Sequence, residues 1–145
     1  MESKSEVMKE FEAECMVDGK FHYDLCGLDN IYLVNGFNLE ETEDDVLVSI
    51  NDVPGLHRAI MHTVISEGGR LTGPEIRFLR HELELTQSHL ARMLDTDSQN
   101  IGRWEKGKYT INGSADKLLR FICHEYLGEN PVVTDLLNSY AELDD

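Results

Sequence analysis

The sequence has no long apolar run, few cysteines and few basic residues, and each shortage argues against a class of protein. No stretch of about 18 uncharged apolar residues is present, and the N-terminal segment MESKSEVMKEFEAE lacks the apolar core of a signal peptide. We therefore expect no membrane association and a cytoplasmic protein. Three cysteines, Cys15, Cys26 and Cys123, fit a reducing compartment better than a disulfide framework.

Motifs of metal centres and of enzymes are also missing. Cys15, His22 and Cys26 offer three metal ligands, whereas a structural zinc site normally takes four in CxxC or HxxxH-like spacing. We interpret Cys26 as a small core residue and His22 as an ordinary strand residue. No nucleophile elbow, P-loop, G-x-G-x-x-G or HExxH motif occurs, and the acidic stretch 40–45 is interpreted as a solvated loop. We expect no metal, no cofactor and no catalysis.

Basic residues are scarce overall but are concentrated in one segment. The chain carries 13 Lys and Arg against 28 Asp and Glu, a net charge of −15. Between residues 70 and 120 there are nine basic and seven acidic residues, a local charge of +2, which leaves −17 elsewhere. A DNA-binding surface must neutralise phosphates, so this segment is the candidate for one. Its small charge predicts weak, salt-sensitive binding per copy and favours a dimer.

The first part of the chain is predicted to be a small acidic α+β module, residues 1–68, that ends in a Gly-Gly hinge. Residues 1–18 form a helix-permissive leader without a strong cap. Three segments with strand character follow and predict a short antiparallel sheet. Asp52 and Pro54 then start a helix whose apolar residues recur at i, i+4 and i+8. The expected strands are residues 20–23, 31–34 and 46–50.

Residues 69–145 carry the signals of five helices. Thr72-x-x-Glu75 is a capping box that starts the first helix, and Thr86 starts the second. A third helix is expected over residues 98–106. The apolar positions predicted to face the core are Ile76, Leu79, Leu83, Leu90, Ala91, Leu94, Ile101, Trp104, Leu118, Leu119 and Ile122.

Two further helices complete the predicted domain. Ser114 is expected to cap the fourth helix, Gly128 to end it, and Pro131 to open the fifth. Their apolar side chains are too numerous for isolated surface helices, so they pack on the domain or on a second copy. We favour a homodimer through these two helices. Its two third helices would then lie about 34 Å apart on a palindromic operator.

The third helix is expected to have a buried side and an outward side. At 100° per residue, Ile101 and Trp104 face the core. The opposite side carries Gln99, Gly102, Arg103 and Lys106. Glutamine pairs with adenine and arginine with guanine in the major groove, and a glycine allows close approach to the base edges. Base contacts are therefore predicted for Gln99, Arg103, Asn100 and Ser98, and phosphate contacts for Gln87, Lys106, Lys108 and Arg77.

Two adjacent segments resemble a known family. Thr86-Gln87-x-x-Leu90-Ala91-x-x-Leu94 followed by Ile101-x-x-Trp104-Glu105-Lys106-Gly107-Lys108 resembles the signature of XRE/Cro-family helix-turn-helix regulators, over residues 70–125. A small module before such a domain is similar to MqsA-type antitoxins of the zinc-finger/helix-turn-helix group, although their paired CxxC motifs are missing here. The resemblance implies a Cro/phage-repressor-type fold with Gln99 and Arg103 as base readers.

These observations predict a mainly α protein in which a five-helix helix-turn-helix domain follows a small α+β module with a short antiparallel sheet. Its expected function is sequence-specific transcriptional regulation, as an autorepressor that binds a double-stranded DNA operator through residues 98–106. An alternative stays open. In MqsA-type systems the N-terminal module binds a toxin, so the acidic module here can bind a basic toxin-like protein, or it can serve only dimerisation or solubility.

Overall fold

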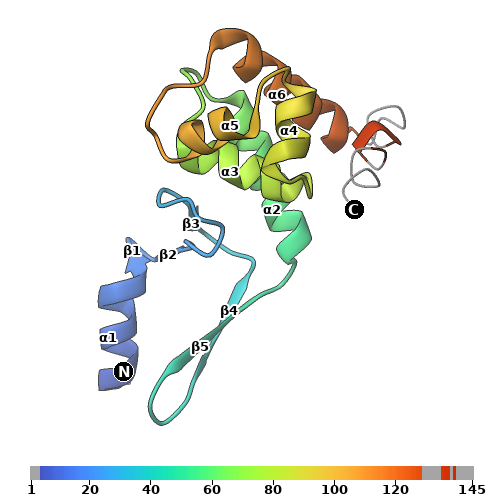
Figure 1. Cartoon of the computed structure of the whole chain (residues 1–145). Helices are drawn as coiled ribbons and strands as arrows, with labels where there is room; N and C mark the ends of the chain where they lie inside the picture. Colours follow the sequence, from blue (N-terminus) through green and yellow to red (C-terminus); the bar gives the residue numbers. More distant parts are fainter. Residues whose placement is uncertain (1–3, 129–134, 138, 140–145) are drawn as a thin grey trace. The chain divides into compact units, whose positions relative to one another are not determined.

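Helices dominate the structure, and the described strands form two short antiparallel sheets near the start of the chain (Figure 1). This computed structural model describes residues 4–128, 135–137 and 139. The chain divides into two compact units, Met1–Leu56 (unit 1) and His57–Asp145 (unit 2). None of the helices in the described ranges is both long enough and apolar enough to cross a bilayer.

Unit 1 combines one helix with the two sheets. Helix α1 (Glu6–Cys15) is capped by Ser5, whose Oγ accepts a hydrogen bond from the Met8 N–H at 3.1 Å. The sequence did not reveal this cap. Three strands form an antiparallel sheet in chain order, and two more form a hairpin. The strands are β1 (Met16–Val17), β2 (Lys20–His22), β3 (Tyr32–Leu33), β4 (Phe37–Glu41) and β5 (Val46–Ile50).

The strand predictions are confirmed for three strands, whereas β1 and β4 were missed. β1 has only two residues, which is too short to show a pattern. β4 reads FNLEE, and its two glutamates placed it in a predicted acidic loop. Glu40 and Glu41 instead pair with Leu47 and Val46 across the hairpin. Aromatic contacts support the unit, since the ring centroids of Phe21 and Phe37 lie 5.5 Å apart.

The boundary between the units falls within α2 (Val53–Ser66), earlier than the predicted boundary at residue 68. Asp52 caps this helix as predicted, because its Oδ1 accepts a hydrogen bond from Gly55 N–H at 3.0 Å. Most of α2 belongs to unit 2. The Arg58 guanidinium donates to the Leu127 carbonyl at 2.9 Å, and three apolar side chains of the helix are buried. These are Ile60, Met61 and Val64.

The Gly68-Gly69 segment, predicted to be a hinge, is held by hydrogen bonds from a side chain of unit 2. Arg120, on helix α6 (Gly113–Leu127), donates from Nε to Asp116 Oδ1 at 2.8 Å, and the same carboxylate accepts the Leu71 N–H at 2.8 Å. The guanidinium also donates to three carbonyl oxygens around the glycine pair. These belong to Ile65, Glu67 and Gly69, at 3.0, 2.5 and 2.7 Å.

Removal of this clamp should destabilise the protein. We expect Arg120→Met to lower the free energy of unfolding by about 2–4 kcal/mol, because buried Asp116 loses one of its two donors and several carbonyl groups lose the guanidinium. Urea unfolding followed by the fluorescence of Trp104, the single tryptophan, measures the change. Lys117→Met, at an exposed position on the same helix, should change stability by less than about 0.5 kcal/mol. Equal effects of the two substitutions would contradict the clamp.

Within residues 57–128, four helices follow α2, and their starts match the predicted caps with one exception. Thr72 and Glu75 form the predicted capping box. Thr86 caps the next helix. The cap of α6 is Asn112 rather than Ser114, since Asn112 Oδ1 accepts the Ala115 N–H at 2.8 Å. The helices before α6 are α3 (Gly73–Glu82), α4 (Gln87–Met93) and α5 (Ser98–Glu105).

The predicted core of unit 2 is buried except for Leu118, which is 40% exposed on α6. Gly128 ends α6 as expected. The fifth predicted helix and its dimer contacts fall largely outside the described residues. Within the described part, residues 135–137 are helical and Leu137 is buried.

Candidate functional site

A tight turn between α4 and α5 fixes where α5 begins. Asp95 adopts a left-handed backbone with φ of 56°, a conformation that Asp tolerates better than most residues. The Thr96 N–H then bonds the Ala91 carbonyl at 2.8 Å, which closes the end of α4. Asp97 caps α5, because its Oδ1 accepts the Asn100 N–H at 2.8 Å. Gly107, with φ of 75°, follows the helix end.

One side of α5 is buried and holds the helix in unit 2. Ile101 and Trp104 are 0% and 4% exposed, as the 100° rotation predicts. α5 packs against both α4 and α3. Because only the opposite side of this short helix is accessible, its outward residues form a defined surface.

A buried ion pair that the sequence did not reveal joins α3 to α5. The Arg80 guanidinium donates to both carboxylate oxygens of Glu105, at 2.7 and 3.0 Å, and to the Leu85 carbonyl at 3.1 Å. Both side chains are nearly buried, with 11% and 6% exposure. Glu105 Oε1 also accepts a hydrogen bond from Gln87 Nε2 at 3.2 Å. The first residue of α4 is thereby linked to the last residue of α5.

Gly73 permits the close approach of α3 and α5. A Cβ atom at this position would lie 2.3 Å from the carbonyl oxygen of Glu105 and 2.8 Å from that of Trp104. Both obstacles are backbone atoms of α5, which cannot rotate away as a side chain can. Glycine at the start of α3 is therefore a requirement of the packing that positions α5.

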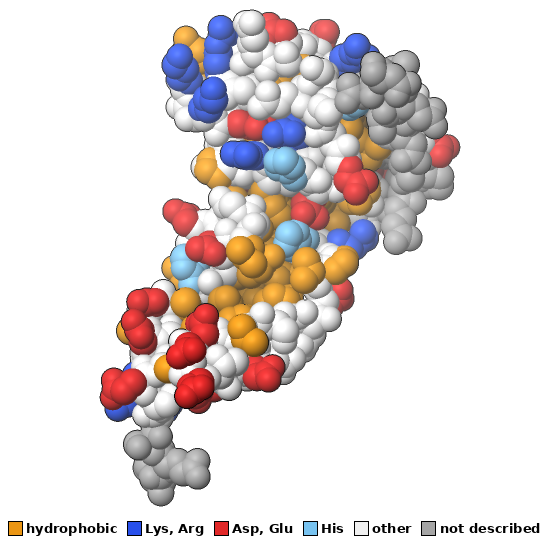
Figure 2. Space-filling view, turned by 60° about the horizontal axis from the view of Figure 1, so that its bottom comes forward, with side chains coloured by type: hydrophobic (Ala, Val, Ile, Leu, Met, Phe, Trp, Pro, Cys, Tyr) orange, Lys and Arg blue, Asp and Glu red, His pale blue; other side chains and the backbone are white. Residues whose placement is uncertain are grey.

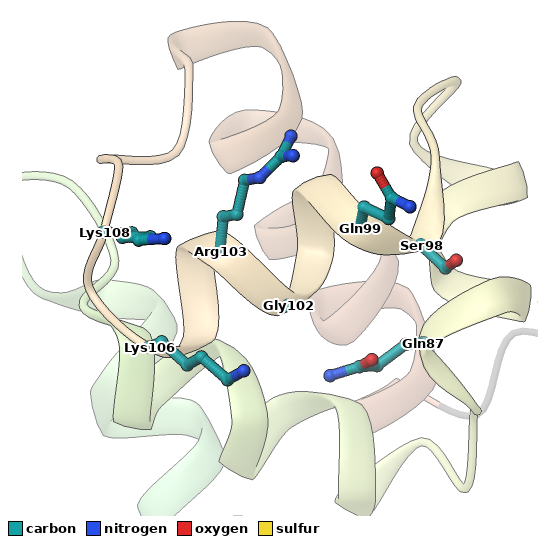
Figure 3. A pocket seen from close by; sticks show the side chains of 7 residues that line it. All are labelled: Gln87, Ser98, Gln99, Gly102, Arg103, Lys106 and Lys108. Carbon is teal, nitrogen blue, oxygen red and sulfur yellow. The ribbon is translucent and has the colours of Figure 1, made fainter.

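The outward side of α5 lines a concavity of about 570 Å³ (Figure 3). None of its lining residues is acidic, and three carry positive charge. Figure 2 likewise shows Lys and Arg side chains grouped on unit 2 and many Asp and Glu side chains on unit 1. In the close view, Gln99 and Arg103 lie on one side of Gly102, and Gln87 and Lys106 on the other. The lining residues are Gln87, Ser98, Gln99, Gly102, Arg103, Lys106 and Lys108.

Six of the eight predicted site residues meet in this concavity, and two do not. Asn100 was predicted to contact bases, but its Nδ2 donates a hydrogen bond to Thr96 Oγ1 at 2.9 Å on the flank of α5. Arg77 is exposed on α3 and does not line the concavity. The remaining six are Gln87, Ser98, Gln99, Arg103, Lys106 and Lys108. Apart from Gly102, every residue that lines the concavity is therefore one of the predicted site residues.

The possible metal ligands of unit 1 have other contacts. His22 Nε2 lies 2.7 Å from the Asp29 carbonyl oxygen, and its ring stacks on Tyr32. Burial raises the pKa of the Cys15 thiol, as do the nearby negative charges of Glu14, Asp24 and Asp45. A raised pKa disfavours the thiolate that metal binding requires. Within residues 4–128, 135–137 and 139, no group of three or more His, Cys, Asp and Glu is arranged to hold a metal ion.

Comparisons with protein-family models, curated proteins and solved structures find no match for this chain. The resemblance to XRE/Cro regulators therefore rests on the motif in residues 86–108.

Proposed function

We propose that this protein is a sequence-specific DNA-binding transcriptional regulator that reads the major groove with α5. In this proposal α4, the turn and α5 are a helix-turn-helix of the Cro/phage-repressor type, within a five-helix domain. The observation that carries it is the joint placement of Gln99, Gly102 and Arg103 on the exposed side of a helix whose other side is buried. A helix held in this way can enter a groove with its polar face forward.

The side chains around the concavity divide into base-reading and phosphate-binding groups. Gln99 can bond adenine N6 and N7, and Arg103 can bond guanine O6 and N7, each with two hydrogen bonds. Lys106 and Lys108 supply positive charge at the end of α5, where phosphates would pass. Gln87 stands at the first turn of α4, where backbone N–H groups favour a phosphate.

A homodimer on a palindromic operator follows from the modest charge of one copy. A local charge of +2 over residues 70–120 gives one copy little phosphate attraction, so two half-sites are needed for useful affinity. The exposed apolar residues Leu118 and Phe121 on α6 offer a surface for pairing. Occupation of a promoter by such a dimer would repress transcription, and autorepression is the form that we propose.

Two substitutions should separate base reading from phosphate binding. Arg103→Ala should cost about 1–3 kcal/mol of discrimination at one base position in each half-site. Lys108→Ala should weaken binding to all DNA about equally and lower the salt slope by about 1. Binding of the purified protein to DNA upstream of its own gene and to a scrambled fragment of equal length, across a salt series, measures both effects.

The matched control is Arg77→Ala, an exposed arginine of the same unit outside the concavity. It should retain the preference for the upstream fragment. The assignment of roles would be wrong if both variants behaved alike, that is, if Arg103→Ala, like Lys108→Ala, weakened binding to the upstream fragment and to the scrambled fragment by the same factor. No preference of the unsubstituted protein at any salt concentration would contradict operator binding itself.

A second candidate is an antitoxin-like function in which unit 1 binds and neutralises a basic protein. Acidic residues dominate the part of the chain outside residues 70–120. That part carries a net charge of −17. Among them lie exposed apolar side chains, including Leu25 and Val34, that can supply buried contact area. Failure of operator binding combined with copurification of a small basic protein encoded beside the gene would favour this function.

A further inference from the structure

Glycine at position 102 has no explanation within the fold. Gly102 lies inside α5, where glycine is less favourable than alanine. Its backbone is not left-handed, unlike that of Gly107. A Cβ atom at Gly102 would meet nothing closer than the Gln87 side-chain amide, at 3.8 Å, which is ordinary van der Waals contact. Neither backbone conformation nor internal packing therefore requires the glycine, in contrast to Gly73.

The space beside Gly102 is a notch, and one of its walls is held in place by hydrogen bonds. Gln87 forms one wall, and its amide is held by the hydrogen bond to Glu105, which is itself held by Arg80. Gln99 and Arg103 rise on the other side (Figure 3). The floor is bare backbone, whose exposed atoms at this position are the apolar Cα–H groups. The notch is thus a small site between Gln87 and the two proposed base-reading side chains, Gln99 and Arg103.

We propose that this notch receives the 5-methyl group of a pyrimidine in the major groove, from thymine or from 5-methylcytosine. The inference rests on the proposed function, because it assumes that α5 enters the groove. Gln99 and Arg103 would occupy polar atoms of the neighbouring bases, and the methyl group is the apolar feature that a base edge displays there. A polar base atom over the Cα–H floor would lose water without gaining a hydrogen bond, whereas a methyl group gains contact.

The expected effects follow from the size of one methyl group. Replacement of the recognised thymine by uracil in one half-site should weaken binding of the unsubstituted protein about fourfold. This factor corresponds to the free energy gained when one apolar carbon is buried. Gly102→Ala places a methyl group where the base methyl would lie. This variant should bind the thymine operator more weakly and should not distinguish thymine from uracil at that position. Its fold should be kept, since alanine favours the helix and fits beside Gln87.

The experiment uses the full-length protein and an operator selected from random double-stranded DNA. Fluorescence anisotropy then measures binding after each thymine is replaced by uracil and each cytosine by 5-methylcytosine, one at a time. A uracil-sensitive position between those that depend on Gln99 and Arg103 identifies thymine, and a gain with 5-methylcytosine identifies the methylated base. Thermal unfolding confirms that Gly102→Ala is folded. Gly68→Ala, at an exposed glycine with open space around it, is the matched control and should bind like the unsubstituted protein.

The outcomes separate this inference from the function on which it rests. Selection of no DNA sequence would overturn operator binding and the notch together. A selected operator whose binding is indifferent to every methyl change would overturn the notch alone. The same holds if Gly102→Ala keeps the methyl dependence of the unsubstituted protein.

Discussion

Glu105→Ala should lower the free energy of unfolding by about 3–5 kcal/mol, because the nearly buried guanidinium of Arg80 would lose its charged partner. The two bonds between these side chains, at 2.7 and 3.0 Å, join α3 to α5. Without these two bonds, the Arg80 guanidinium keeps only its hydrogen bond to the Leu85 carbonyl. Urea unfolding followed by Trp104 fluorescence should show the loss as a lower midpoint.

A double substitution distinguishes the cost of an unpaired charge from the net value of the pair. Arg80→Met combined with Glu105→Leu removes both charges and keeps apolar volume, so it should be less destabilised than Glu105→Ala. Glu67→Ala, at an exposed glutamate of the same unit, serves as the control and should change stability by less than about 0.5 kcal/mol. If the double variant were the least stable of the three, the pair itself would be the main stabilising feature.

The helices of unit 2 could be predicted because their signals are local. Thr72 and Glu75 stand three residues apart, and a capping box depends on nothing else. Ile101 and Trp104 share a face by helical rotation alone. The outward positions of Gln99 and Arg103 follow from the same rotation. The residues that line the concavity could therefore be predicted from the sequence, whereas its depth and shape could not.

Features that depend on distant residues could not be predicted in this way. Arg80 and Glu105 are 25 residues apart, and no sequence feature near either residue indicates that the other is its partner. The clamp of Arg120 on the Ile65 carbonyl spans 55 residues, so the glycine pair was interpreted as a hinge. Asn100 is a different case. Its partner Thr96 lies four residues earlier, and that spacing could have indicated this local hydrogen bond.

Gly73→Ala should disturb stability and, under the proposed function, DNA recognition, because an added methyl group meets the backbone of α5. The new Cβ would overlap the Glu105 carbonyl oxygen at 2.3 Å, so α3 and α5 must separate. Overpacking of this kind costs about 1–3 kcal/mol of folding free energy. The same displacement would move Gln99 and Arg103 relative to the groove, and a shift of about 1 Å is enough to spoil bidentate hydrogen bonds.

The matched control is Gly113→Ala, whose Cβ would approach Arg70 at 2.8 Å. That obstacle is the end of a flexible side chain and can move at little cost, whereas the carbonyl beside Gly73 cannot. Operator affinity, scrambled-DNA affinity and urea unfolding should be measured for both variants. Gly73→Ala should lose more affinity for operator than for scrambled DNA, and Gly113→Ala should keep its stability. Equal stability of the two variants would mean that α3 and α5 can separate freely, and the position of α5 would then have to depend on the Arg80–Glu105 pair instead.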